Sequence, residues 1–185
     1  MVLGGVHGNE SASLLVVPRA NRLSTYEFER TRSGFGDRNR LYPGYAESLL
    51  PMARMAAEIT FAAQQFDVDL LLDLHESWDF FAEHDERGTA FLGQTVRKGD
   101  GPFELAEVAA IAGGVNEQAS TREQLLLRDR RSFGGGGGSS LSLGRHVPGL
   151  TPLLIEMGQQ NQPEWRRAEL HQLFVRSTLE RWARL

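Results

Sequence analysis

The sequence predicts an α/β fold, in which short buried strands of a sheet alternate with amphipathic helices. Short apolar runs that end in polar, glycine-flanked turns recur along the 185 residues, and longer stretches with helical periodicity separate them. A chain of this length buries roughly 70% of its unfolded surface, which is enough for one hydrophobic core. We therefore expect a single domain over residues 1–185.

Five apolar segments are expected to form the strands. The third, DLLLDL, is almost continuously apolar, as expected of a central strand that is covered on both faces. We therefore place it in the middle of the sheet. The five predicted strands comprise residues 2–5, 14–17, 69–74, 89–92 and 152–157.

Three segments are expected to form helices. Residues 51–65 start with Pro51, which suits a first helical turn. Residues 102–112 form the second predicted helix, which Gly113 and Gly114 should terminate. The third starts with Asn161 and Glu164 at the spacing of a capping pair, with Pro163 in the first turn. The predicted inward faces are Met52, Met55, Ala56, Ile59 and Ala63 in the first helix, and Leu170, Leu173, Phe174 and Trp182 in the last.

Composition excludes several classes of protein. The chain has no cysteine, which excludes a disulfide scaffold and a cysteine zinc cluster. Its net charge is −4 and its basic residues are spread along the chain, so we expect no nucleic-acid partner. No apolar run approaches the ~20 residues that span a bilayer, and the start lacks the features of a signal peptide, so we expect a cytoplasmic protein without a membrane partner.

Two histidines and one glutamate follow predicted strands. His7 lies just beyond the first strand, His75 ends the most apolar strand, and Glu156 lies at a third strand end. Because ligands of open α/β sheets collect beyond the carboxyl ends of strands, we expect these side chains at one edge of the sheet.

These residues have the composition of a metal centre. Glycine lies between His7 and Glu10, which are three residues apart, so a sharp turn can bring imidazole and carboxylate to one cation. With His75 they form a His, Glu, His set, which is typical of a catalytic zinc ion with one position open for water. Imidazole and carboxylate ligands also suit other divalent ions, and a lone histidine near a strand end is usually structural.

The remaining candidate residues are an acid and several bases. Water at such a centre needs a base that takes its proton and passes it to the leaving nitrogen, and Glu156 is our candidate, with a salt-bridged carboxylate as the alternative. Arg32 and residues 37–44 follow the second strand on an extended loop. Guanidinium groups bind carboxylates or stabilise an oxyanion. The alternative for Arg32 and for the arginines of residues 37–44 is that they are ordinary surface charges.

In combination, these motifs resemble the succinylglutamate desuccinylase/aspartoacylase family, which belongs with the M14-type zinc carboxypeptidases. The resemblance implies that one zinc ion is bound by His7, Glu10 and His75, that Glu156 is general base and acid, and that Arg32 polarises the scissile carbonyl. It also implies that Asn39 and Arg40 hold a substrate carboxylate, and that the fold is a three-layer α/β/α sandwich on a mixed sheet. The matching segments are GGVHGNE at 4–10, Arg32, DRNR at 37–40 with YPG at 42–44, DLH at 73–75 and EMG at 156–158.

The sequence departs from this family at three places. Only three residues separate Glu10 from Leu14, too few for a parallel crossover, so the second strand pairs differently or is not a strand. The missing helix would uncover one face of the sheet, from which we expect low stability or a homo-oligomer. The chain also starts at the first metal-bearing strand, as a trimmed or minimal domain would, and carries no tyrosine before Glu156 where carboxypeptidases have one.

Three functions follow from these observations. The first is a zinc-dependent amidohydrolase, a deacylase that cleaves the amide bond of an N-acyl amino acid or a similar small amide that bears a carboxylate. The second is a zinc carboxypeptidase that trims a short peptide or cell-wall fragment, and the third is a non-catalytic metal-binding module. The five glycines at 134–138 form either a surface loop or a flap over the site.

Overall fold

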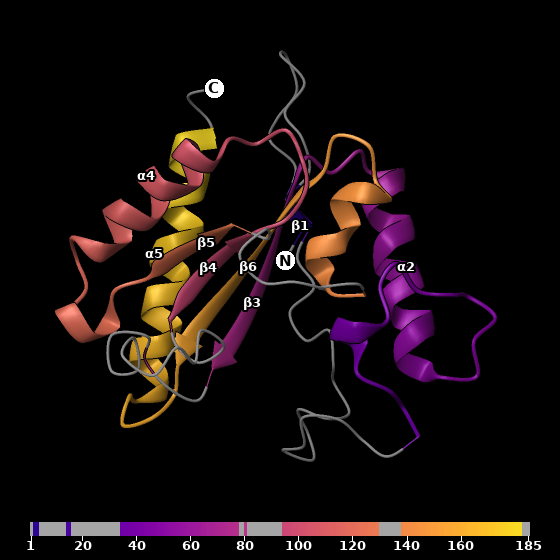
Figure 1. Cartoon of the computed structure of the whole chain (residues 1–185), viewed down its shortest axis with the longest axis horizontal. Helices are drawn as coiled ribbons and strands as arrows, with labels where there is room; N and C mark the ends of the chain where they lie inside the picture. The colour runs from indigo at the N-terminus through magenta and orange to yellow at the C-terminus, as the bar shows by residue number, and fades with distance from the viewer. Residues whose placement is uncertain are drawn as a thin grey trace. The chain divides into compact units, whose positions relative to one another are not determined.

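The structure, a computed structural model, describes residues 2–3, 14–15, 34–77, 80, 94–129 and 138–182. It has the mixed α/β composition that the sequence predicts (Figure 1). The strands are β1 (Val2–Leu3), β2 (Leu14–Leu15), β3 (Leu70–Ser77), β4 (Thr95–Lys98), β5 (Leu126–Asp129) and β6 (Thr151–Gly158). The helices are α2 (Pro51–Gln65), α4 (Leu105–Asn116) and α5 (Glu164–Trp182), with short 3-10 helices η1 (Arg38–Arg40), η3 (Thr121–Glu123) and η5 (Ser140–Arg145).

The strands form one mixed sheet in the order β2-β1-β3-β6-β4-β5. Strand β1 pairs antiparallel with both β2 and β3, whereas β4 and β5 are parallel. Strand β3 therefore lies inside the sheet, as its apolar sequence predicts. The antiparallel pairing of β1 and β2 also explains how the short segment before Leu14 can connect the two strands, because antiparallel neighbours need no crossover helix.

The strand predictions differ from the structure in extent. Strand β3 continues to Ser77, so the prediction that His75 ends the strand is wrong, and β6 continues to Gly158, beyond Glu156. Strands β4 and β5 were not predicted, because each has four residues and includes charged side chains. The strand predicted at 89–92 lies outside the described residues.

Helix α2 has the predicted bounds, but the other two helices do not. Helix α4 continues through Gly113 and Gly114 to Asn116, so the predicted stop is wrong. Burial of the apolar side chains of α4 outweighs the propensity cost of two glycines. Asn161 has a φ of 54° in the turn before α5, so it does not cap that helix.

The inward faces of α2 and α5 were predicted in part. Met52, Ala56 and Ala63 are buried as expected in α2, and Leu170 and Phe174 are buried in α5. The other predicted inward positions, Met55 and Ile59 in α2 and Leu173 and Trp182 in α5, are half-buried.

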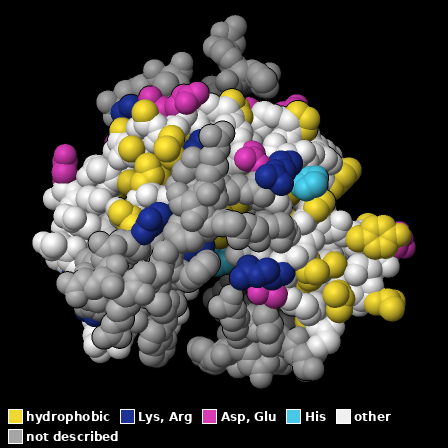
Figure 2. All heavy atoms as spheres, viewed as in Figure 1, with side chains coloured by type: hydrophobic (Ala, Val, Ile, Leu, Met, Phe, Trp, Pro, Cys, Tyr) yellow, Lys and Arg dark blue, Asp and Glu magenta, His cyan; other side chains and the backbone are white. Residues whose placement is uncertain are grey.

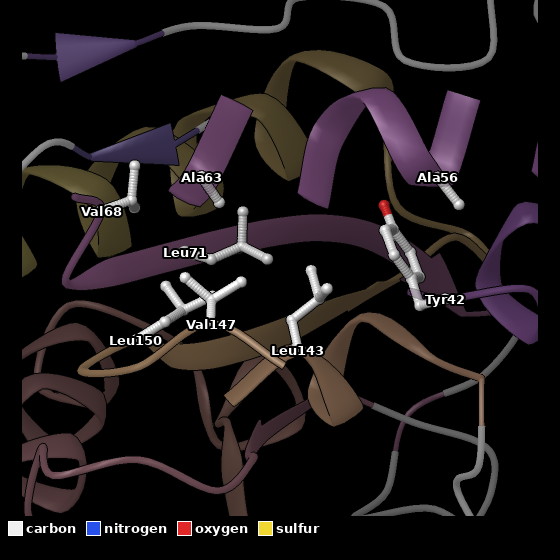
Figure 3. Close-up of a cluster of buried hydrophobic side chains, with 8 residues drawn as sticks. All are labelled: Tyr42, Ala56, Ala63, Val68, Leu71, Leu143, Val147 and Leu150. Carbon is white, nitrogen blue, oxygen red and sulfur yellow. The ribbon is translucent and has the colours of Figure 1, made fainter. Parts of the chain in front are cut away.

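The chain divides into two compact units, which share the strands β3 and β6. The first comprises Met1–Leu72, Gly99–Pro102 and Arg130–Leu153. Its core joins α2, β3 and η5 with the segments that flank them (Figure 3). The side chains of this core are Tyr42, Ala56, Ala63, Val68, Leu71, Leu143, Val147 and Leu150.

The first unit also exposes large apolar side chains on α2 and beside it. Apolar side chains at the surface of the described residues are yellow in Figure 2. The largest of them in this unit are Tyr45, Leu49, Phe61 and Phe66. An oligomer that covers such a surface stays a prediction.

The second unit comprises Asp73–Lys98, Phe103–Asp129 and Leu154–Leu185. In it α4 packs against α5, and the rings of Phe103 and Trp182 lie 5.4 Å apart between their centroids. The segment that contains η3 is fixed to α5 by an ion pair between Glu123 and Arg166 at 2.9 Å. Among the helices of the described ranges, none has the length and apolar character needed to cross a membrane.

Candidate active site

Strand β3 carries the predicted metal ligand His75 and, on the same face, Asp73. Side chains alternate along a strand, so Asp73 and His75 point to the same side. His75 Nε2 lies 3.0 Å from Asp73 Oδ2, and the two side chains are 25% and 13% exposed. A carboxylate that binds one ring nitrogen of a histidine fixes the tautomer and the orientation of the ring. This is the arrangement usual for a histidine that binds a metal ion, with Asp73 two residues from His75 on the same strand.

Glu156 lies beside His75 on the neighbouring strand. Thr151 N donates to Asp69 O, and Gln159 N donates to Ser77 O, so β3 and β6 run in the same direction. The offset in sequence is the same for both bonds, which means that the register continues unbroken between them. In a parallel ladder an N–H bonds the carbonyl of the residue before its partner, and this register pairs His75 with Glu156. The two side chains therefore share one face of the sheet.

Burial along β6 marks Glu156 as the exception in its strand. Every other residue of β6 is buried, whereas Glu156 is half-buried. Within the described ranges no hydrogen bond or ion pair involves its carboxylate. The alternative of a salt-bridged carboxylate thus finds no support in this part of the chain.

The opposite side of β3 is held by α5. Glu76, which points to the other face from His75, pairs with Arg167 of α5 at 2.7 Å. His171 Nε2 lies 3.1 Å from the carbonyl oxygen of His75 and donates to it. Burial lowers the pKa of His171 to about 4, which the nearby carboxylate of Glu76 opposes only in part, so this imidazole is neutral at neutral pH.

His171 is therefore a structural residue of α5 that supports the strand of a predicted metal ligand. The sequence indicates the burial of His171 by its position beside Leu170 and three residues before Phe174, because Leu170 and Phe174 lie on the inward face of α5.

Asn39 and Arg40 lie in η1 of the first unit. Asn39 N donates to Asp37 Oδ1 at 2.9 Å, and the side-chain Oδ1 of Asn39 accepts a bond from Ser140 N at 3.0 Å. Arg40 Nη1 donates to Asn39 O at 2.8 Å, and the Arg40 side chain is exposed. Both side chains are hydrogen-bond donors that suit a carboxylate.

The remaining predicted site residues, His7, Glu10 and Arg32, lie outside the described residues. The structure thus brings together His75, Asp73 and Glu156 in one unit, and Asn39 with Arg40 in the other. Among the described residues, no group of three or more His, Cys, Asp or Glu side chains could hold a metal ion.

Comparisons with known proteins show the fold alone. No family model matches the chain. A search of the curated proteins finds no match either.

Solved structures, in contrast, do match. The apo cell shape determinant protein Csd4 from Helicobacter pylori is 16% identical, with a TM-score of 0.64 over 82% of this chain and 39% of its own. Its Gln46His variant is also 16% identical, with a TM-score of 0.70 over 90% of this chain and 42% of its own. The chain thus spans about two fifths of the length of these proteins. The similarity confirms the predicted zinc-carboxypeptidase-like fold, a three-layer α/β/α sandwich on a mixed sheet.

Proposed function

We propose that the chain carries the catalytic centre of a zinc-dependent amidohydrolase of the succinylglutamate desuccinylase/aspartoacylase kind. Its substrate would be an N-acyl amino acid or a similar small amide that bears a carboxylate. The observation that carries this proposal is the position of Glu156, a half-buried carboxylate without a partner among the described residues, beside the Asp73–His75 pair.

The metal would be held by His75 together with His7 and Glu10. Support for this comes from Asp73, because a carboxylate at one ring nitrogen of His75 prepares the other for a cation. When bound, zinc would activate the attacking water and polarise the scissile carbonyl.

Glu156 would supply the proton transfers. Its carboxylate would accept a proton from the attacking water and donate it to the leaving nitrogen. Arg32 would share the negative charge that develops on the carbonyl oxygen. Asn39 and Arg40 would bind the carboxylate of the substrate, which sets the orientation of the amide.

A zinc carboxypeptidase that acts on short peptides is the second candidate. The carboxypeptidase-like fold favours it, since the chain resembles Csd4 over most of its length. The two activities differ in the size of the group on the acyl side of the scissile bond. Hydrolysis of a panel of N-acyl amino acids and short peptides distinguishes them.

The first experiment is elemental analysis of the purified protein. About one zinc per chain is expected, with loss of hydrolysis on chelation and recovery when zinc is returned. A protein that folds normally in chelator, binds no metal and hydrolyses no member of the panel would contradict both enzymatic functions. It would favour a non-catalytic module.

The second experiment tests the base. E156Q should retain zinc and lose turnover by about 10²- to 10⁴-fold, the range of general acid–base catalysis. The matched control is E58Q, the same change at an exposed position of α2. Turnover of E156Q within a few-fold of the parent would show that another group is the base.

A further inference from the structure

The residues after the glycine run are bonded to the segment that carries Asn39 and Arg40. Tyr42 N donates to Gly138 O at 2.8 Å. Ser140 N donates to Asn39 Oδ1 at 3.0 Å, although 101 residues separate the two in sequence. Both ends of the 39–42 segment are thus held by residues 138–140.

Gly138 fits this contact because it lacks a side chain. Its φ of +89° lies in the left-handed region, and a Cβ at this position would lie 2.1 Å from Arg40 O. Any other residue would displace the backbone of Arg40, because backbone atoms cannot rotate away as the end of a side chain can.

The bond from Ser140 determines which group Asn39 presents. With Oδ1 occupied as an acceptor, the amide orientation is fixed and Nδ2 is the polar group that remains on this side chain. Nδ2 can only donate, as can the guanidinium of Arg40. The pair therefore offers donors to an anion.

We propose that Gly138 and Ser140 are positioning residues that hold Asn39 and Arg40 in the geometry that binds a substrate carboxylate. This inference rests on the proposed function and extends it to the end of the glycine run. It assigns residues 138–140 a role in affinity for acidic substrates, and that role does not require the run to move as a flap.

Two variants disturb the contacts independently. G138A introduces a Cβ against Arg40 O, and G149A is its matched control, since Gly149 has a φ of +81° in the same unit and a Cβ there meets nothing within 4 Å. S140P removes the N–H that bonds Asn39. Proline suits this position, because Ser140 is the first residue of η5 and the preceding Ser139 is extended.

The probes are N-acetyl amino acids and their carboxamides, which lack the negative charge. Binding is measured by calorimetry and hydrolysis by steady-state kinetics, with folding checked by circular dichroism. For the acids, G138A and S140P should each raise Kd and KM by about tenfold, the worth of one hydrogen bond to a charged group, with kcat within about threefold of the parent. For the carboxamides, and for G149A with either probe, Kd and KM should stay at the values of the parent.

Two results would overturn the inference, and each can be distinguished from a failure of the proposed function. Equal losses for acids and carboxamides would mean that residues 138–140 only stabilise the fold. Parent-like Kd values in S140P, which stands in if G138A does not fold, would mean that the bond to Asn39 does not matter for binding. A parent protein that binds zinc and the acids without hydrolysing either probe would contradict the proposed function while calorimetry still tests the positioning role.

Discussion

His171 should make the protein less stable in mild acid. Burial lowers its pKa to about 4 from the ordinary 6.5, so the unfolded chain binds a proton on this group at a higher pH than the native protein does. The neutral imidazole contributes its full stability above pH 6.5, and this contribution is lost as the pH falls through 6.5 towards 4. Between pH 7 and pH 5 the loss amounts to about 2 kcal/mol.

The assay is urea unfolding followed by circular dichroism at pH 7, 6 and 5, for the parent and for H171N. The asparagine amide can still donate to the carbonyl of His75, but it does not titrate. The difference in unfolding free energy between parent and H171N should therefore shift by about 2 kcal/mol over this range, in favour of the variant at low pH. H146N, which removes an exposed histidine, is the control. Parallel pH profiles of parent and H171N would refute the argument.

Three further predictions concern the metal centre, α4 and the ion pair beside η3. D73N should weaken zinc binding by about 10- to 100-fold in competition with a chelator, whereas E76Q, on the other face of β3, should leave zinc affinity unchanged. Replacing both Gly113 and Gly114 by alanine should raise the unfolding free energy by about 0.5–1 kcal/mol for each substitution, because neither new Cβ would meet an atom within 4 Å. Thermal melts measure this gain. Melts that show no gain would mean that α4 is not continuous at these residues. The hydrogen bond from Arg166 lowers the pKa of Glu123 to about 2 from 4.5, so the stability that the Glu123 carboxylate contributes is lost as the pH falls from 4.5 to 2. Unfolding measured against pH in acid should show no such loss for E123Q. An acid profile of E123Q that matches the parent would exclude a stabilising role for this ion pair.

The parts of the fold that were predicted correctly have strong local signals. Helix α2 has Pro51 at its start and an apolar stripe along its length, and β6 contains the continuous apolar run of residues 152–155, so both have a signal in their own sequence. Strands β4 and β5 have no such signal. They are strands because Thr95 pairs with Leu126 and the following residues continue that ladder, an arrangement that depends on the tertiary fold.

The candidate site was predicted by residue type and only in part by geometry. His75 and Glu156 were chosen as residues at strand ends, yet they lie within longer strands and are brought together by the register of β3 and β6. Asp73 was recognisable because it lies two residues from His75 on the same strand. The contacts of Ser140 with Asn39 and of His171 with His75 join residues far apart in sequence, and no periodicity or motif indicates such pairs.

The contact between Asp73 and His75 has a consequence for how this kind of protein can diversify. Both side chains stand on one strand, so the local backbone sets their spacing. Insertions or deletions in the connecting segments would leave the spacing of these two side chains along the strand as before. Natural variants could therefore acquire new substrates by exchanging loops around an inherited strand, without having to rebuild this element of the chemistry each time.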